Sequence, residues 1–278
     1  MIDLHTHSTV SDGSDPPERI PELAADAGCR AVALTDHDRL DGLAAAGARS
    51  AELGLEFVPG VEVSCEVPTG TMHLLVYWIE AGHGPLQQEL GGLQDERAAR
   101  NRRMVGRFAE LGLPVTEAEL RAEAGGDGIG RPHAAAVLVR KGVVASVQEA
   151  FDVWLAKGKP AYVEKGRLLP AQALELARAS KGVPVLAHPL SLGLEAAELE
   201  RTINEFHAAG LAGIEATYGR YSPEDRAGLA ALAARVGVVA TGGSDHHGTY
   251  KPDLRVGVGR GDLDVPDRVL EELAARRP

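Results

Sequence analysis

The chain has 278 residues, 44% of them hydrophobic and 25% charged, which is typical of a globular protein rather than a disordered one. Acidic residues outnumber basic ones by 40 to 29, so the formal net charge is −11 and the chain lacks the positive field that long duplex nucleic acid requires. No secretion signal is visible and no apolar run approaches the roughly 20 residues that span a bilayer. The only cysteines, Cys29 and Cys65, are expected in the core, and we therefore expect a cytoplasmic protein with no membrane partner.

Most of the chain alternates short β-branched runs with amphipathic stretches. Beyond an opening strand, strands are expected over 31–35, 55–58, 183–187, 211–215 and 236–240. Helices are expected over 16–27, 170–180, 196–209, 222–235 and 266–277, with Gly or Pro at many of their boundaries. This repeated order of strand and helix predicts an α/β protein with a mostly parallel sheet, closed or open.

Residues 82–158 break the alternation, because they contain almost no strand-like run. We therefore expect a helical insertion domain over 82–158 and a main domain made of 1–81 and 159–278. The glycine-rich stretch 125–128 is expected to be flexible. The segment 94–111 is rich in arginine, a good helix former, and presents either a solvated face or a basic wall for a polyanion. Its arginines are Arg97, Arg100, Arg102, Arg103 and Arg107.

Two histidines two residues apart, His5 and His7, end the opening strand, so both imidazoles lie on one side of it and can bind one ion. Asp36-His37-Asp38 follows the next apolar strand, and the carboxyl ends of parallel strands form the active face of α/β folds. An alternative for this triplet is a helix N-cap beside a hydrogen-bonded histidine. In the metal-site interpretation, Asp36 and Asp38 orient the ligand histidines.

Two later strands each supply one potential ligand, Glu62 and His73. A carboxylate can bridge two cations in a two-metal site, whereas a lone histidine in a strand is more often a hydrogen-bonded core residue. Asp245 and His247 again follow an apolar strand at a spacing of two. The recurrence of such side chains at strand ends predicts a metal site at one face of the sheet.

In chain order, the motifs HTH, SDG, TDHD, GVE, MH, GRPH, AHP, GIE and SDHHG resemble the PHP (polymerase and histidinol phosphatase) family over nearly the whole chain. More narrowly, residues 130–133, 146–151, 158–163 and 185–189 are similar to its stand-alone bacterial branch, which acts on nucleotide phosphates. The resemblance implies a distorted (β/α)7 barrel of PHP type with a helical insertion.

The family pattern also implies nine metal ligands and two or three divalent ions, which mixed imidazole and carboxylate ligands allow to be manganese, iron or zinc. The family arrangement divides these ligands among three ions: His5, His7, Glu62 and Asp245 on the first; Glu62, His73 and His133 on the second; Asp12, His37 and His247 on the third. His246 is expected to line the site without binding metal.

The resemblance implies hydrolysis of a phosphate ester by a metal-bound hydroxide, without a serine or cysteine nucleophile. Arg131 is expected to bind phosphate through its planar guanidinium, the alternative being a structural salt bridge. His188 is expected to be the general acid, the alternative being a structural role. Glu215 and Lys159 are weaker candidates for substrate contacts.

The implied partner is a small phosphorylated substrate: a 3',5'-bisphosphonucleoside, an AMP-like nucleotide or a short 5'-phosphorylated oligoribonucleotide. The alternatives are a small-metabolite phosphatase, such as histidinol phosphatase, and a non-catalytic metal-binding module of a larger assembly. Replacing Asp12, which we count among the catalytic residues, or His247 is expected to abolish hydrolysis. Replacing His83 or His207, both expected at the surface, is expected to leave it intact.

Overall fold

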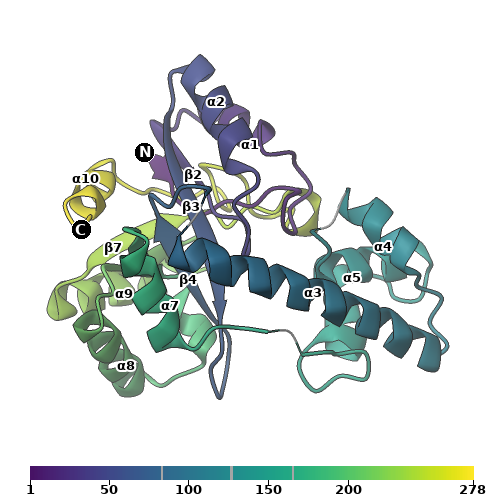
Figure 1. Ribbon diagram of the computed structural model, residues 1–278. Coiled ribbons are helices and arrows are strands. Elements are labelled where there is room, and N and C mark those ends of the chain that lie inside the picture. The colour runs from purple at the N-terminus through teal and green to yellow at the C-terminus, as the bar shows by residue number, and fades with distance from the viewer. Residues whose placement is uncertain (83, 126–127, 165) are drawn as a thin grey trace.

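The computed structural model describes residues 1–278 except 83, 126–127 and 165, so His83 and part of the stretch 125–128 lie outside the described residues. Within them, one sheet contains seven strands whose spatial order follows the chain (Figure 1). Neighbouring strands are parallel except for the pairs β3–β4 and β4–β5. The strands are β1 (Ile2–Asp3), β2 (Ala31–Leu34), β3 (Glu56–Cys65), β4 (Met72–Tyr77), β5 (Val183–Leu186), β6 (Gly213–Tyr218) and β7 (Val239–Gly243).

The sheet curves until its two ends meet. The main-chain N–H of Leu4 donates to the carbonyl oxygen of Gly242 (3.3 Å), and that of His7 donates to the carbonyl oxygen of His246 (3.0 Å). Thr6 also forms a parallel bridge with His246. The sheet is therefore a nearly closed barrel, which confirms the expected distorted (β/α)7 fold.

The strand β4 runs against both of its neighbours, although the sequence predicts a mostly parallel sheet. Only residues 66–71 connect β3 to β4, and a parallel pair needs a crossover of about a dozen residues or more. The two strands therefore form a hairpin. Its register pairs His73 with Ser64, two residues along β3 from Glu62 and on the same face of the sheet.

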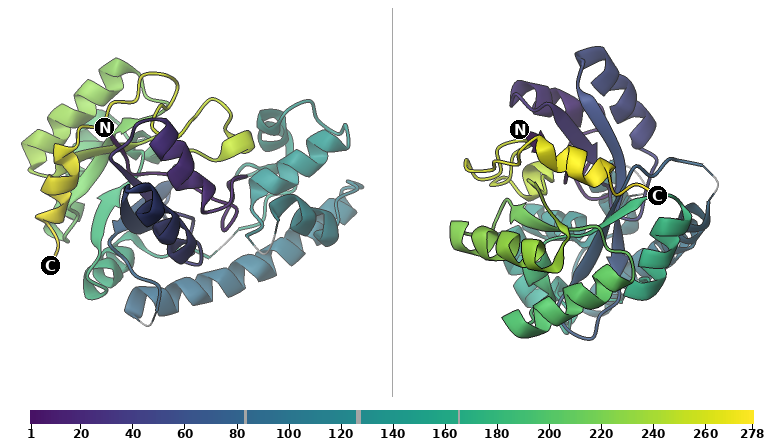
Figure 2. Two further views of the ribbon diagram at one scale, coloured as in Figure 1. Left: turned by 90° about the horizontal axis from the view of Figure 1, so that it is seen from above. Right: turned by 90° about the vertical axis from the view of Figure 1, so that its left-hand side faces the viewer.

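Helices cover the outside of the barrel (Figures 1 and 2). They are α1 (Arg19–Asp26), α2 (Leu43–Leu53), α7 (Pro170–Ala179), α8 (Ala196–Ala208), α9 (Pro223–Val236) and α10 (Arg268–Ala274), with 3-10 turns η2 (Pro189–Leu192) and η3 (Gly248–Tyr250). The five predicted helices are all present with shifted ends, whereas α2 was not predicted. Small residues fill most of α2, so its sequence has little apolar periodicity. The helix ends at Gly54 in the left-handed region (φ 69°).

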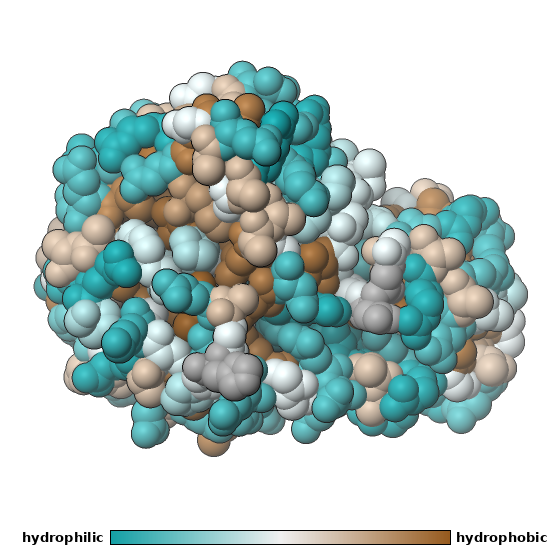
Figure 3. All heavy atoms as spheres, turned by 45° about the horizontal axis from the view of Figure 1, so that its top comes forward, coloured by the Kyte–Doolittle hydropathy of each residue, from teal (hydrophilic) through white to brown (hydrophobic). Residues whose placement is uncertain are grey.

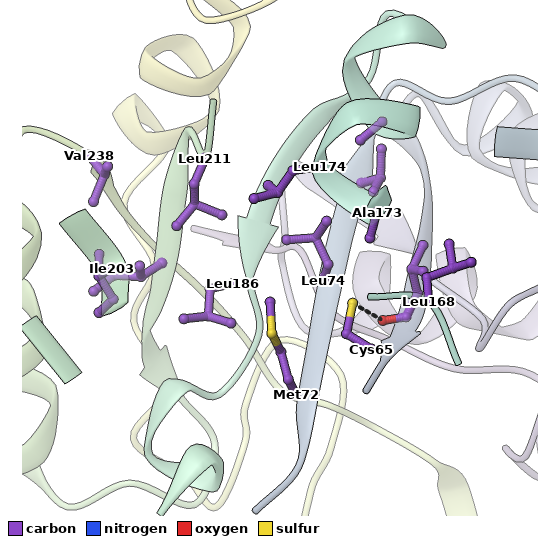
Figure 4. Packing of buried hydrophobic residues seen from close by; sticks show 14 of the residues in the cluster. Cys65, Met72, Leu74, Leu168, Ala173, Leu174, Leu186, Ile203, Leu211 and Val238 are labelled. Carbon is purple, nitrogen blue, oxygen red and sulfur yellow. Dashed lines mark hydrogen bonds between the residues drawn. The ribbon is translucent and has the colours of Figure 1, made fainter. Parts of the chain in front are cut away.

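The core beneath α7 and α8 shows how strands and helices pack. Figure 4 shows Leu74 of β4 and Leu186 of β5, which are register partners, below Leu174 of α7. These three side chains are fully buried, and burying a leucine contributes roughly 1.5–3 kcal/mol relative to exposure. Both cysteines are buried, as expected, and neither forms a disulfide within the described residues.

A group of helices lies beside the barrel instead of around it. The long helix α3 leads from the barrel to the smaller helices at its far end, as both Figure 1 and the left view of Figure 2 show. These elements are α3 (Pro85–Glu110), α4 (Glu117–Ala124), α5 (Arg131–Arg140), α6 (Val147–Ala150) and the π-helical turn η1 (Phe151–Leu155). Phe108, Leu120 and Leu138 join helices α3, α4 and α5 in a separate hydrophobic cluster. The helical content agrees with the sequence, while the boundaries of an insertion domain stay a prediction.

The surface in Figure 3 is mainly hydrophilic, with hydrophobic residues gathered in the middle of the larger body. Within the described part of the chain, no helix is both long and apolar enough to span a bilayer.

Candidate metal centre and active site

Imidazoles and carboxylates converge at one end of the barrel, as the sequence predicts. Most of them are buried. They come from strands or from the loops that follow them, and we call them the ligand cluster: His5 and His7 after β1, Asp12 in the same loop, His37 after β2, Glu62 in β3, His73 in β4, His188 after β5, and Asp245 and His247 after β7.

Glu62 lies at the centre of the ligand cluster. Its Oε2 atom lies 3.1 Å from His7 Nε2 and 3.0 Å from His37 Nδ1. Its Oε1 atom lies 2.9 Å from His73 Nδ1 and 3.0 Å from His188 Nε2. The two oxygens thus face different imidazoles, which is the arrangement of a carboxylate that bridges two ions.

The imidazoles of His5 and His7 present nitrogen lone pairs to each other. The Nδ1 atom of His5 donates to Glu215 Oε1 at 2.9 Å, and Nδ1 of His7 faces the Ser11 hydroxyl at 3.4 Å. Both Nε2 atoms are therefore left without protons in the neutral rings, yet they lie 3.1 Å apart. Two ligand nitrogens about 2.1 Å from the same ion would lie about 3 Å apart. The donor set therefore fits a bound cation.

The charges at this end of the barrel also favour a cation. Burial lowers the pKa of His7, but hydrogen bonds with Asp245 and Glu62 outweigh it and raise the pKa to about 9. Burial raises the pKa of Glu62, but the nearby His37 and His73 hold it well below its usual value. Positive charge between these groups is thus stabilised, whether protons or divalent ions supply it.

A second part of the ligand cluster surrounds Asp12. The Nδ1 atom of His247 donates to the carbonyl oxygen of Asp245 at 2.9 Å, which turns its Nε2 atom toward Asp12 Oδ1 at 3.3 Å. His37 Nε2 lies 3.8 Å from the same oxygen. Three groups of ligand atoms each lie within 4.8 Å of one another among the described residues: His7, Asp12, His37 and His247; His5, His7 and Asp245; His37, Glu62 and His73.

The surroundings of His133 and His188 differ from those that the sequence leads us to expect. His133 is the third residue of α5, and its Nδ1 atom accepts the N–H of Gly130 at 2.9 Å. Its Nε2 atom must then carry the proton in the neutral ring, so it offers no lone pair to a metal. In contrast, His188 directs Nδ1 at the Ser191 hydroxyl (2.9 Å) and Nε2 at Glu62. The geometry favours His188, and not His133, beside Glu62 and His73.

Backbone strain occurs at the same end of the barrel. Asp38, His188 and Asp245 have positive φ angles of 55°, 27° and 57°, a region that costs a residue other than glycine about 1–3 kcal/mol. Asp38 accepts the Ser64 N–H (2.8 Å) and pairs with Arg97 (2.7 Å). Two of these three residues, His188 and Asp245, belong to the ligand cluster, so the surrounding structure holds them in conformations that are otherwise unfavourable.

Two predicted substrate contacts lie away from the cavity. Glu215 is fully buried, and its carboxylate holds His5 Nδ1 and the main-chain N–H of His188 (2.8 Å). This position favours orientation of the ligand cluster over contact with substrate. Lys159 is exposed in the loop after η1. The ring of His246 lies between Leu254 O and Asp15, both at 2.9 Å, and does not line the cavity.

Sequence reasoning missed two groups that hold Asp245. Tyr218 Oη and Lys251 Nζ donate to its Oδ2 atom at 2.7 and 2.5 Å. Tyr218 lies on β6 and no spacing rule links it to Asp245, whereas Lys251 follows it by six residues in a loop. Only the structure brings the three together.

A cavity of about 550 Å³ lies between the ligand cluster and the helices α3 and α5, a size that suits a nucleotide-sized ligand. Asp12, His37, His73 and His247 line one side. The other side contains what we call the arginine wall: Arg97, Arg100, Arg131 and Arg167. Arg131 has no carboxylate partner among the described residues, so the alternative of a structural salt bridge is not observed.

A buried imidazole–carboxylate cluster at the mouth of a distorted α/β barrel, beside an arginine-lined cavity, defines a metal-dependent phosphoesterase. The PHP domain model matches residues 3–114. A 3',5'-nucleoside bisphosphate phosphatase of Chromobacterium violaceum is 34% identical over 99% of this chain and 97% of its own length. The chain belongs to the PHP family.

Two further comparisons agree. The 5'-3' exoribonuclease Rnm of Salmonella typhimurium is 33% identical over 89% of this chain and 85% of its own length. A crystal structure from Bifidobacterium adolescentis, described as a candidate metal-dependent phosphoesterase, superposes with a TM-score of 0.87 at 29% identity, covering 100% of this chain and 96% of that one. Because these two curated relatives align over most of their own length and are named as enzymes, the alternative of a non-catalytic module is set aside.

Proposed function

We propose that this chain hydrolyses phosphate esters of nucleotides: 3',5'-bisphosphonucleosides, AMP-like nucleotides or short 5'-phosphorylated oligoribonucleotides. The observation that carries the proposal is one cavity lined by the ligand cluster on one side and by arginines on the other. The names of the two curated relatives, a nucleoside bisphosphate phosphatase and an exoribonuclease, support a nucleotide or short RNA as substrate. A cytoplasmic location stays a prediction.

We propose that two or three divalent ions, manganese, iron or zinc, bind the ligand cluster. When bound, such ions supply a nucleophile from water at neutral pH and neutralise charge on the phosphoryl oxygens. The proposed ligands are His5, His7, Glu62 and Asp245 for one ion, Glu62, His73 and His188 for a second, and Asp12, His37 and His247 for a third.

The remaining residues position these groups and the substrate. Glu215 fixes the tautomer of His5 through its Nδ1 proton, a type of contact that raises the basicity of a ligand nitrogen. Arg131 faces the cavity and can hold a phosphoryl group through two parallel N–H donors. We also propose that residues 82–158 form an insertion domain that supplies most of the arginine wall.

The test is metal analysis of the purified chain followed by hydrolysis assays with adenosine 3',5'-bisphosphate, AMP, short 5'-phosphorylated RNA and histidinol phosphate. We expect bound divalent metal and a kcat/KM at least tenfold higher for a nucleotide or RNA than for histidinol phosphate. Comparable values for all four would contradict nucleotide specificity, and the highest value for histidinol phosphate would support a small-metabolite phosphatase.

A further inference from the structure

The two oxygens of the Asp245 carboxylate contact different groups. Its Oδ1 atom faces two ligand nitrogens, with His7 Nε2 at 3.4 Å and His5 Nε2 at 3.6 Å. Its Oδ2 atom accepts hydrogen bonds from Tyr218 Oη at 2.7 Å and from Lys251 Nζ at 2.5 Å. Each carboxylate oxygen has about two lone-pair sites, so these two donors use the full capacity of Oδ2. Only Oδ1 is left for a metal ion.

The fold holds Tyr218 beside Asp245 independently of any ion. Tyr218 is the last residue of β6, and its register partner is Gly243, the last residue of β7 and two residues before Asp245. The residue is 9% exposed. Its ring lies edge-on to those of Tyr221 and His188, with centroids 4.8 and 5.5 Å away. Strand pairing and ring packing therefore fix the position of the hydroxyl that donates to Oδ2.

Lys251 brings a positive charge to a carboxylate that a metal ion also needs. Its main chain is fixed in a turn, where its N–H donates to the carbonyl oxygen of Gly248 (3.2 Å) and its carbonyl oxygen accepts the N–H of Leu254 (2.9 Å). The side chain is 27% exposed and could extend into solvent, yet its ammonium pairs with Asp245, whose side chain is 3% exposed. Because the carboxylate is buried, salt screens it weakly and the ammonium acts strongly on nearby charges.

The other carboxylates of the ligand cluster have no such cation. Among the described residues, the cationic side chains within 4.0 Å of Asp12 and Glu62 are all histidines. A lysine pairs with Asp245. The ammonium therefore acts mainly on one part of the ligand cluster. This part is the group that we propose for one ion, called the first ion below: His5, His7, Glu62 and Asp245.

We propose that Tyr218 and Lys251 are positioning residues that limit Asp245 to binding the first ion through Oδ1, and that the charge of Lys251 weakens this bond. The ammonium and the ion draw electron density from the same carboxylate, so the carboxylate donates less to the ion. The first ion is then bound less tightly but keeps more of its charge for polarising a phosphoryl group. This inference rests on the metal binding proposed above and adds which ion binds more weakly, and why.

The first test measures metal affinity and needs no turnover. The chelator-treated, folded full chain competes with a chromophoric chelator for manganese. Lys251→Gln keeps a donor near Oδ2 but removes the charge, so we expect one class of sites to bind manganese at least tenfold more tightly. A contact that only supports the fold would give the opposite sign, because loss of an outer-shell partner typically weakens metal binding by about 10–100-fold. Weaker or unchanged binding would overturn the proposal.

Further variants separate charge from orientation. Lys251→Arg keeps the charge and should bind manganese as the wild type does. Lys251→Met is also neutral, should match Lys251→Gln, and decides the question if Lys251→Gln does not fold. Tyr218→Phe removes a neutral donor, so its affinity should change less than that of Lys251→Gln. Lys157→Gln changes an exposed lysine in the loop after η1 and should leave the affinity unchanged. Equal affinities for Lys251→Arg and Lys251→Gln would show that charge is not the cause, and would overturn the proposal.

The second test compares turnover of adenosine 3',5'-bisphosphate at saturating manganese. Lys251→Gln should lower kcat at least fivefold with little change in KM, while Lys251→Arg should retain the wild-type kcat. Tighter metal binding together with a lower kcat is the expected result, since a purely structural role would lower both. An unchanged kcat, or a loss confined to KM, would overturn the proposal. If the wild type binds manganese but hydrolyses no nucleotide, the proposed function fails, while the affinity comparison still supports or overturns the role of Lys251.

Discussion

The ligand cluster and the arginine wall line the same cavity but offer opposite charges to a substrate. The ligand cluster presents carboxylates and imidazole nitrogens that face them, and it attracts cations. The arginine wall already carries positive charge, part of it unpaired. Strand ends and the loops after them hold the first region, and the helices α3 and α5 hold three of the four arginines of the second. A phosphate ester can thus be bound through ions on one side and directly on the other, so damage to the two regions should have different consequences.

The largest effect is expected for Glu62→Gln, which removes the charge between the two sets of imidazoles. Loss of metal should lower kcat by a factor on the order of 10³ or more, because each 1.36 kcal/mol of lost stabilisation is tenfold in rate. Initial hydrolysis rates measure the fall in kcat, and mass spectrometry measures the loss of bound metal. His207→Gln is the control, because His207 lies near the end of α8 on the outside of the barrel, where its Nδ1 atom contacts the carbonyl oxygen of Leu211. A full rate for Glu62→Gln would exclude a central role for this carboxylate.

A second prediction separates His188 from His133. His188→Asn should weaken metal binding by a factor on the order of 10² or more, since even outer-shell partners typically contribute 10–100-fold. His133→Asn should keep metal binding, because its amide oxygen can accept the Gly130 N–H and retain the start of α5. Competition with a chromophoric chelator gives both affinities. The opposite order would restore the assignment of His133 as a ligand.

A third prediction concerns protons released by metal. In the metal-free chain the pKa of His7 is raised to about 9, so below that pH its Nε2 atom carries a proton that an entering ion must displace. The apparent metal affinity should therefore rise with pH up to about 9. Calorimetry at pH 7.5 in two buffers of different ionisation enthalpy detects the released protons. Binding enthalpies that do not depend on the buffer would show that His7 is already neutral.

The smallest effects are expected on stability at the arginine wall. Arg97→Met removes the cation from the buried Asp38 and should lower the free energy of unfolding by about 3 kcal/mol. Arg100→Met removes a buried charge that has no carboxylate partner among the described residues, and it should raise the free energy of unfolding by about 1 kcal/mol. Urea unfolding measures both changes. If the two variants were destabilised equally, Arg100 would have a partner that stabilises it in the folded chain.

The parts of this molecule that follow from local pattern were predictable from the sequence. Apolar strands followed by ionisable residues led to His5, His7, His37, Glu62 and Asp245, because strand ends meet at one end of a barrel whatever the details of packing. The five helices with a clear apolar stripe were also predicted, whereas α2, made of small residues, was not.

The parts that depend on contacts distant in sequence could not be predicted. The sequence gives no rule for choosing between His133 and His188 as a partner of Glu62, because each follows a short motif and the choice depends on what the other ring nitrogen contacts. The antiparallel strand β4 follows from a short connection, and its consequence for His73 depends on the hairpin register. The unpaired state of Arg100 is a property of the folded wall, invisible among five similar arginines.

Anomalous diffraction from crystals of the chain grown with manganese tests the central claim most directly. The account predicts anomalous peaks on both sides of the Glu62 carboxylate, one within bonding distance of His5, His7 and Asp245 and another beside His73 and His188. His133 should retain its contact with the Gly130 N–H and lie outside every coordination sphere. An absence of peaks at Glu62, or an ion bound by His133 in place of His188, would contradict it.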